Sequence, residues 1–208
     1  MPDQADHLRD LIQGARNAPQ GSAAPQRIVV AGAKGGVGTT TVAVNLAVGL
    51  ARQGRQAVLV DGDLGKSGIA ALCGDVPGAT IGDVLSGRRR IEEALAPGPA
   101  GVHLLAGAWA TGQLTDCDPA SQERLIAGFN GLSTADVVVI DAGCGLHRIL
   151  ERFWRAADHV LLVMTPDDTA VMDAYATLKT VAARHRHVPV YAVMNRVAHY
   201  DDARDTHA

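Results

Sequence analysis

The sequence predicts a three-layer α/β protein, in which helices cover both faces of a mostly parallel β-sheet. Short β-rich runs alternate with helical stretches after residue 26, as expected for successive β-α-β units. The strongest run, Val137 to Ile140, is continuously apolar rather than alternating, which is typical of a strand buried on both faces. With 208 residues, 47% of them hydrophobic, the chain is large enough for one domain with such a sheet.

The predicted strands are separated by stretches long enough for crossover helices. They cover residues 27–31, 57–60, 101–106, 136–140, 159–164 and 188–194. A helix follows the first strand and runs through Arg52. We expect Gly54 to end this helix, because glycine readily adopts the left-handed backbone conformation found just after helix ends.

The N-terminal segment differs in composition from the rest of the chain. Apolar residues recur at helical spacing in 3–16, and Asp3 can cap the start, so this segment predicts a short amphipathic helix. Residues 17–26 are rich in Pro, Gly, Ser and Ala and are expected to form a linker. We therefore divide the chain into residues 1–26 and a domain of residues 27–208. Composition leaves open whether the helix binds a partner or folds back on the domain.

Charge and hydropathy exclude several classes of function. A net charge of -3 gives no basic excess, so we expect no specific nucleic-acid binding, and the cluster Arg88–Arg90 is expected to be a solvated turn. No apolar run approaches the roughly 18 residues of a membrane span, and the polar N-terminus lacks a signal-peptide core. We therefore expect a cytoplasmic protein. The cysteines at 73, 117 and 144 show no C-x-x-C pairing and are expected to be buried, reduced thiols.

The first strand leads into a glycine-rich loop and the N-terminus of a helix. The loop and first turn read Ala33-Lys34-Gly35-Gly36-Val37-Gly38-Thr39-Thr40-Thr41. Backbone N–H groups and the helix dipole at such a junction bind phosphate. Thr40 falls where a Walker A loop places the hydroxyl that ligates Mg²⁺. This segment therefore predicts a site for nucleotide phosphates and Mg²⁺.

The run Lys-Gly-Gly-Val-Gly at 34–38 resembles the signature of the MinD/ParA family of deviant-Walker-A P-loop ATPases. In that family an early lysine, Lys34 here, reaches across an ATP-dependent homodimer to the phosphates held by the other subunit. The resemblance implies a three-layer P-loop NTPase fold, ATP or ADP with Mg²⁺ as ligands, and ATP hydrolysis.

Polar residues after later strands extend the resemblance. Asp61-Gly62-Asp63 resembles the family's Asp-x-Asp switch, in which Asp63 would position the attacking water and Asp61 would lie near the Mg²⁺ ligands. Asp141, which we expect to end its strand, resembles a Walker B aspartate that holds Mg²⁺ through water. Asn195 and Arg196 resemble the family's adenine-side residues. The alternative interpretation of Asp61 and Asp63 is an acidic turn that caps a helix.

Thr39 departs from the family pattern. Most members carry at this position a second lysine, which neutralises the β- and γ-phosphates from within the same subunit. Losing one charge-assisted contact costs on the order of 1.5–3 kcal/mol, or roughly one to two decades in affinity. Nucleotide binding tolerates this loss better than hydrolysis does. We therefore expect a slow ATPase, with a nucleotide-binding protein that does not hydrolyse ATP as the alternative.

Further stretches resemble the FlhG branch of the family, also called FleN or YlxH, whose members regulate flagellar number. They are residues 61–74, 79–87, 99–107 and 157–176. Asp3-Gln4-Ala5-Asp6-His7-Leu8-Arg9 resembles the element with which FlhG proteins engage the FlhF-type GTPase and stimulate GTP hydrolysis. Gln4 would act on the GTPase site, and Leu8 and Arg9 belong to the same partner-binding element. An ordinary capped helix without a partner is the alternative reading of residues 3–9.

Other branches and the C-terminal segment complete the expectations. Family members continue after the asparagine through another strand and a membrane-targeting helix, whereas residues 197–208 show no membrane anchor, so we expect a shortened sheet edge. The pilus-assembly proteins CpaE/TadZ and the cellulose-secretion ATPase BcsQ also tolerate a replaced Walker lysine. The element at 3–9 and the lack of a receiver-like N-terminal domain favour the flagellar branch over these two.

Overall fold

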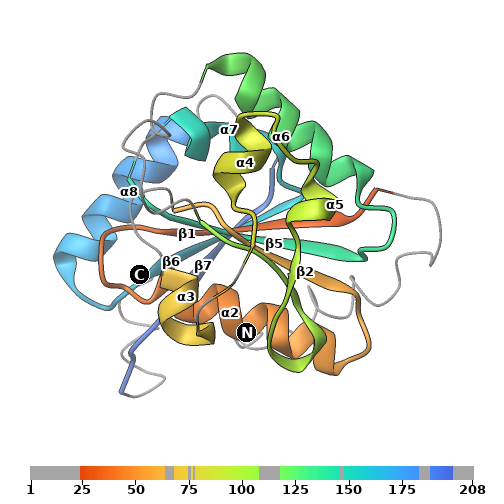
Figure 1. Ribbon diagram of the computed structural model, residues 1–208. Helices are drawn as coiled ribbons and strands as arrows, with labels where there is room; N and C mark the ends of the chain where they lie inside the picture. Colours follow the sequence, from red (N-terminus) through yellow and green to blue (C-terminus); the bar gives the residue numbers. More distant parts are fainter. Residues whose placement is uncertain are drawn as a thin grey trace.

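The structure is a computed structural model that describes residues 24–63, 68–74, 76, 78–107, 118–145, 148–182 and 188–198. Over these ranges the chain forms a seven-stranded sheet of order β3-β4-β2-β5-β1-β6-β7, with helices packed around it (Figure 1). The helix predicted at 3–16 lies outside the described residues.

The elements alternate in chain order as a parallel α/β fold requires. They are β1 (Gln26–Gly32), α2 (Thr39–Arg52), β2 (Ala57–Asp61), α3 (Gly68–Cys73), α4 (Ile81–Leu85), α5 (Ile91–Ala94), β3 (Ala96–Pro97), the 3-10 turn η1 (Pro99–Gly101), β4 (His103–Leu105), α6 (Pro119–Gly131), β5 (Val137–Cys144), α7 (Arg148–Ala156), β6 (His159–Met164), α8 (Asp168–Ala182) and β7 (Val190–Met194). Every neighbouring pair of strands is parallel except β3 and β4. The predicted α/β fold with a mostly parallel sheet is confirmed.

Two strand predictions need correction. β3 was not predicted, because a two-residue strand is too short to show a hydrophobic pattern. β5 does not end at Asp141 but continues to Cys144. The reason lies in the register, since Asp141 still pairs with Asp61 of β2, and Cys144 pairs with Gly32 of β1.

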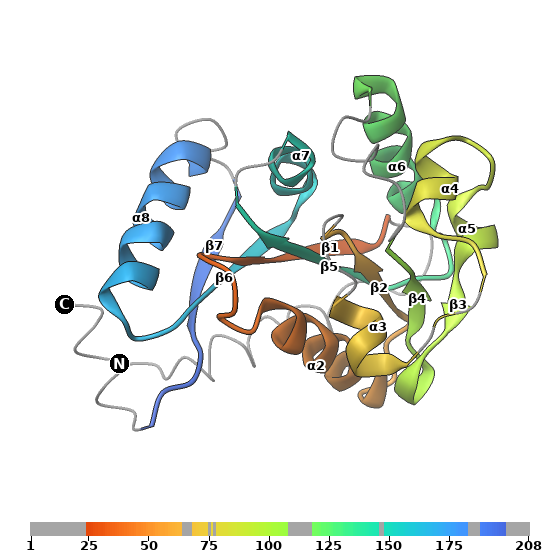
Figure 2. The same cartoon turned by 60° about the vertical axis from the view of Figure 1, so that its left-hand side comes forward.

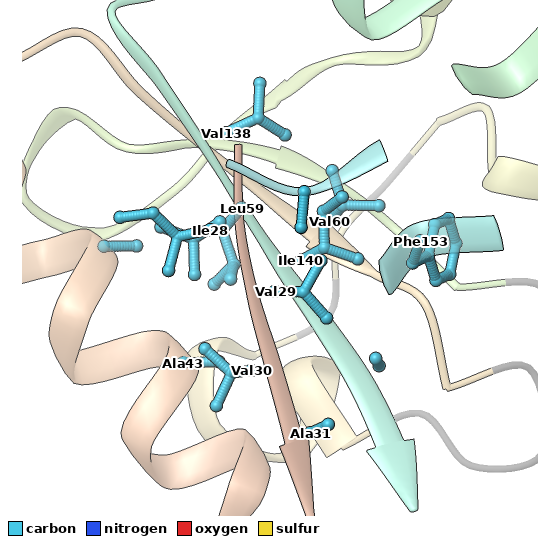
Figure 3. Close-up of a cluster of buried hydrophobic side chains, with 14 of the residues drawn as sticks. Ile28, Val29, Val30, Ala31, Ala43, Leu59, Val60, Val138, Ile140 and Phe153 are labelled. Carbon is cyan, nitrogen blue, oxygen red and sulfur yellow. The ribbon is translucent and has the colours of Figure 1, made fainter. Parts of the chain in front are cut away.

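The core lies on both faces of the central strands β1, β2 and β5. Val30 of β1 points toward Ala43 of α2, whereas Ile140 of β5 lies on the side of Phe153 of α7 (Figure 3). Figure 2 shows α2 and α3 on one side of the sheet, with α6 and α7 on the other. Because residues on both faces are covered, the central strands are apolar at consecutive positions, as the sequence indicated.

Helix α2 is bounded by glycines at both ends. Gly38 precedes it with a left-handed φ of 96°, and Gly54 follows it with a φ of 86°. Only glycine adopts such values at little cost, so the expected helix end at Gly54 is confirmed. None of the helices in the described ranges has the length and apolar character needed to cross a membrane.

Candidate functional site

The nucleotide-site residues expected from the sequence lie at the carboxyl ends of parallel strands. The loop of residues 33–38 joins β1 to α2, Asp61 ends β2, and Asp141 lies near the end of β5. Asn195 directly follows β7. Parallel strands present their carboxyl ends at one edge of the sheet, and this edge is where open α/β sheets bind ligands. Residues far apart in sequence are thus brought to one place.

The loop exposes its backbone while its flanks are anchored. Gly35 and Gly36 are exposed, whereas the Val37 side chain is 1% exposed and packs into the core. The Ala33 N–H donates to the Val163 carbonyl at 2.8 Å, which ties the loop to β6. Gly36 has a φ of 84°, a conformation that glycine permits. A phosphate can therefore approach loop N–H groups that are held by a rigid frame.

Thr39 occupies the position of the family's second lysine and is packed inward. Thr39 is only 8% exposed. A Cβ atom at Gly32 would lie 2.3 Å from the Thr39 Oγ1 atom, so the threonine fills the space that a glycine leaves at position 32. Thr41, in the same first turn of α2, is exposed. The threonine at position 39 therefore supplies no charge to the site.

Two buried carboxylates lie beside each other below the loop. Asp61 is 1% exposed and Asp141 0% exposed, and the two are register partners in β2 and β5. Both oxygens of Asp61 and the Oδ2 atom of Asp141 accept no hydrogen bond of good geometry from the described residues, although the Ile69 and Asp63 N–H groups approach the Asp61 carboxylate and oppose its pKa shift. Burial, followed by the negative charges of Asp141 and Asp63, raises the pKa of Asp61 to about 8. Burial likewise raises the pKa of Asp141, which the Thr40 hydroxyl opposes.

This arrangement fits a magnesium ion held together with phosphate. Buried carboxylates without partners are destabilised in their charged form, and a cation removes that penalty. Mg²⁺ prefers oxygen ligands, and in P-loop proteins a Thr or Ser hydroxyl and phosphate oxygens supply several of them. A Cβ atom added at Gly68 would lie 2.7 Å from the Thr40 Oγ1 atom. The glycine at position 68 therefore leaves room for the Thr40 hydroxyl. In the described part of the chain no three His, Cys, Asp or Glu side chains could hold a metal by themselves.

Asp63 joins the same cluster from the loop after β2. A Cβ atom at Gly143 would lie 2.5 Å from the Asp63 Cγ atom, so the carboxylate packs directly on the backbone of β5. Gly143 has a φ of 64°, which favours glycine independently. The charge of Asp63 contributes to the raised pKa of Asp61 and of Asp141. The expected water-positioning residue thus lies at the same edge as the expected Mg²⁺ site.

Lys34 points to its own chain and contacts residues that the sequence analysis missed. Its Nζ atom donates to Asp167 Oδ1 at 2.5 Å and to Thr169 Oγ1 at 2.6 Å. Asp167 precedes α8 and also accepts from the Ala170 N–H and the Thr165 hydroxyl. The Lys34 ammonium, followed by the two threonine hydroxyls, holds the pKa of Asp167 well below its usual range. The available signal is an aspartate at a helix N-cap three residues after a predicted strand, which locates Asp167 but not its contact with Lys34.

Asn195 forms a hydrogen bond with the phosphate loop. Its Nδ2 atom donates to the Val37 carbonyl at 2.8 Å, and its Oδ1 atom accepts from the Arg196 N–H at 2.9 Å. Arg196 has a left-handed φ of 60°. The adenine-side role expected for Asn195 and Arg196 stays a prediction.

The structure describes only some of the other residues singled out from the sequence. The expected partner-binding residues Gln4, Leu8 and Arg9 are outside the described residues, as is Cys117. Cys73 and Cys144 are only partly buried, so the expectation that they are buried is wrong for these two residues. The cluster Arg88–Arg90 is exposed, and Arg88 and Arg90 pair with nearby carboxylates, as expected for a solvated turn.

Sequence comparisons connect this site with known proteins. Residues 24–80 match the ParA family model, described as NUBPL iron-transfer P-loop NTPase. The chain is 39% identical to the antiactivator FleN of Pseudomonas aeruginosa over 175 residues. This alignment covers 84% of this chain and 62% of FleN. The chain is 28% identical to the flagellum site-determining protein YlxH of Helicobacter pylori over 221 residues. This alignment covers 100% of this chain and 71% of YlxH. The chain thus spans less than two-thirds of the length of FleN.

The fold is also similar to a solved structure with a bound nucleotide. The septum site-determining protein MinD of Pyrococcus horikoshii, complexed with Mg-ADP, superposes with a TM-score of 0.75 at 26% identity. The similarity covers 88% of this chain and 77% of that MinD. The similarity therefore extends over most of the sheet and helices that carry the loop and the carboxylates.

Proposed function

This chain belongs to the MinD/ParA family of P-loop ATPases, and on that premise we propose that it binds ATP or ADP with Mg²⁺ and acts as a nucleotide-dependent switch. One observation supports this proposal above the others. Asp61 and Asp141 are buried register partners, with Asp141 beside Thr40 at the base of a phosphate-type loop, and three of their carboxylate oxygens accept no hydrogen bond of good geometry among the described residues. A Mg²⁺–phosphate complex is the ligand whose charge and oxygen ligands match that arrangement.

The proposed roles follow from where each residue lies. The loop N–H groups and the first turn of α2 hold the phosphates, and bound Mg²⁺ supplies the positive charge that the phosphates and buried carboxylates need. Asp63 orients the attacking water, and Lys34 reaches the phosphates of a second subunit in an ATP-dependent homodimer. The full proposed set is Lys34, Gly35, Gly36, Val37, Gly38, Thr39, Thr40 and Thr41 for phosphate, Thr40, Asp61 and Asp141 for Mg²⁺, and Asn195 and Arg196 for adenine.

We further propose that the switch regulates flagellar number or placement, as in the FlhG branch. The identity of 39% to the antiactivator FleN and the match to YlxH, a flagellum site-determining protein, support this assignment. Residues 3–9 are the proposed contact with an FlhF-type GTPase. In this proposal residues 1–26 carry the partner-binding helix and linker, and residues 27–208 form the nucleotide-binding domain.

Thr39 favours a second candidate, a nucleotide-binding scaffold that does not hydrolyse ATP. The inward packing of Thr39 leaves that position without a cation for the β- and γ-phosphates. If turnover depends on such a cation within the subunit, the chain would still bind nucleotide but release no phosphate. A steady-state ATPase assay, run with and without the GTPase partner, distinguishes a slow ATPase from this scaffold.

Calorimetric titration with Mg-ADP and Mg-ATP tests the shared part of both candidates. We expect binding that is lost when EDTA removes Mg²⁺, and an Asp141→Asn variant that binds at least tenfold more weakly, because a charge-assisted ligand is removed. Glu92→Gln, which changes an exposed carboxylate on α5, is the matched control and should bind like the parent. Absence of binding, or equal affinity with and without Mg²⁺, would overturn the proposal.

A further inference from the structure

Asn195 links the end of β7 to a loop that lies 158 positions earlier in the chain. Its backbone N–H donates to the Met164 carbonyl at 2.7 Å, which fixes the residue against the end of β6. Its side-chain amide lies between the Val37 carbonyl and the Arg196 N–H. A carbonyl requires a donor and an N–H requires an acceptor, so these two partners determine which way the amide is turned.

The bond to Val37 fixes the orientation of one peptide unit in the phosphate loop. The C=O of Val37 and the N–H of Gly38 belong to the same planar trans peptide, so they point in opposite directions. Because the carbonyl is directed at Asn195, the Gly38 N–H is directed away from it. A loop that binds phosphate needs its N–H groups turned to the ligand and its carbonyls turned away.

Gly38 makes this peptide unit easy to rotate unless it is held. Its φ of 96° lies in a region that glycine enters freely, and glycine also permits the alternative peptide orientation. Rotation would turn the Val37 carbonyl oxygen toward the negative phosphate. A Cβ atom at Gly38 would lie 2.3 Å from the Asn195 Nδ2 atom, so the close approach of the amide itself requires glycine.

We propose that Asn195 is a positioning residue for the phosphate loop: by binding the Val37 carbonyl it keeps the Gly38 N–H turned to the phosphates. This inference rests on the proposed nucleotide-binding function and adds a role at the end of β7 that does not involve the base. The two bonds leave the amide one N–H and one oxygen lone pair, so the tether does not exclude a contact with adenine. The two roles differ in the ligand that reveals them, because pyrophosphate has no base.

Two variants and one control separate these roles. Asn195→Ala removes the tether, and Asn195→Asp keeps the shape but directs an oxygen at the Val37 carbonyl. Asn130→Ala is the matched control, because Asn130 bonds to Arg27 and not to the loop. Each full-length protein is titrated with Mg-ADP and Mg-pyrophosphate. Without any ligand, amide hydrogen exchange of the loop at 33–38 is followed by mass spectrometry.

We expect Asn195→Ala to lower the affinity for Mg-ADP and for Mg-pyrophosphate by the same factor, about tenfold. Asn195→Asp should lower both affinities further. The loop at 33–38 should exchange faster in both variants than in the control. A loss confined to ADP with unchanged pyrophosphate affinity would overturn the proposal in favour of base recognition, and so would unchanged loop exchange. If the parent binds none of the ligands, the proposed function fails, while the exchange comparison still decides the tether. Should the alanine variant not fold, the isosteric aspartate variant decides the same comparison.

Discussion

The Nζ atom of Lys34 and the Oδ1 atom of Asp167 are 2.5 Å apart within one chain. The proposed dimer requires the same ammonium to reach phosphates held by a second subunit, so this contact has to break when the dimer forms. Lys34 and Asp167 side chains are 31% and 46% exposed, so water screens the pair and it can open readily. In the proposed dimer this contact would therefore compete with the reach of Lys34 to the second subunit without preventing it.

Asp167→Asn should strengthen ATP-dependent dimerisation by several-fold, because it removes the charge that holds Lys34. Asparagine is also a good N-cap, so the start of α8 and the Ala170 N–H stay satisfied. Sedimentation with Mg²⁺ and a non-hydrolysable ATP analogue measures the dimer dissociation constant. Asp168→Asn, a neighbouring exposed change in the same turn, is the control and should behave like the parent. An unchanged dimer affinity in Asp167→Asn would show that the pair does not restrain Lys34.

Gly38→Val should abolish Mg-ADP binding while the fold persists. The new side chain would collide with the Asn195 amide, where a Cβ atom alone would lie 2.3 Å from Nδ2, and valine also resists a φ of 96°. Calorimetry measures the affinity, and circular dichroism verifies the fold. Gly49→Val on α2 is the control, because no atom lies within 4 Å of a Cβ added there. Equal affinity of Gly38→Val and the parent would remove the phosphate-loop assignment.

Thr39→Lys should tighten ATP by about one to two decades, because it restores a charge-assisted contact to the phosphates. The lysine has to leave the space beside Gly32 that Thr39 now fills. Asn45→Lys adds the same charge on an exposed position of α2 and should change affinity much less. If Thr39→Lys binds ATP like the parent, Lys34 or another cation already supplies the missing charge.

Asp61→Asn should stabilise the nucleotide-free protein against unfolding and lower its affinity for Mg-ADP. The folded-state pKa of about 8 lies above the ordinary value of 3.8, so stability contributed by Asp61 is full below pH 4 and is lost as the pH rises toward 8. The amide carries no charge, and its advantage should therefore grow with pH. Urea unfolding in EDTA should show a gain of about 1–3 kcal/mol at pH 8 and a smaller gain at pH 5. A gain that does not depend on pH would contradict the raised pKa.

Local sequence patterns predicted the elements that carry the site. The range predicted for β6 coincides with His159–Met164, and α2 ends before Gly54 as expected, because buried strands and glycine-terminated helices leave continuous signals. The loop and Asp61 were locatable for the same reason, since each directly follows a buried strand.

Contacts between distant segments left no such signal. The Lys34–Asp167 bond joins residues 133 positions apart, and the bond from Asn195 to Val37 joins residues 158 apart. Neither contact alters hydrophobic periodicity or turn composition. The continuation of β5 past Asp141 to Cys144 was missed for a related reason, because a strand continues past a charged residue only where neighbouring strands pair with it.

The last prediction concerns the N-terminal element, which distinguishes the FlhG branch from other members of the family. A synthetic peptide of residues 1–24 should accelerate GTP hydrolysis by the cognate FlhF-type GTPase. Gln4 would orient the hydrolytic water, as activating glutamines do in GTPases, and thereby raise turnover more than affinity. Leu8 belongs to the apolar stripe expected to bury against the GTPase.

Two changes in the peptide separate catalysis from docking. Gln4→Ala should remove the acceleration while the peptide still binds, because the side chain acts on the reaction and adds little contact area. Leu8→Asp should instead raise the peptide concentration needed for half-maximal stimulation, since it places a charge on the buried stripe. Initial rates of phosphate release, measured over a range of peptide concentrations, give both quantities in one experiment. A GTPase rate unaffected by saturating peptide would leave the nucleotide site intact but withdraw the proposed contact with an FlhF-type GTPase, because that contact rests on residues 3–9.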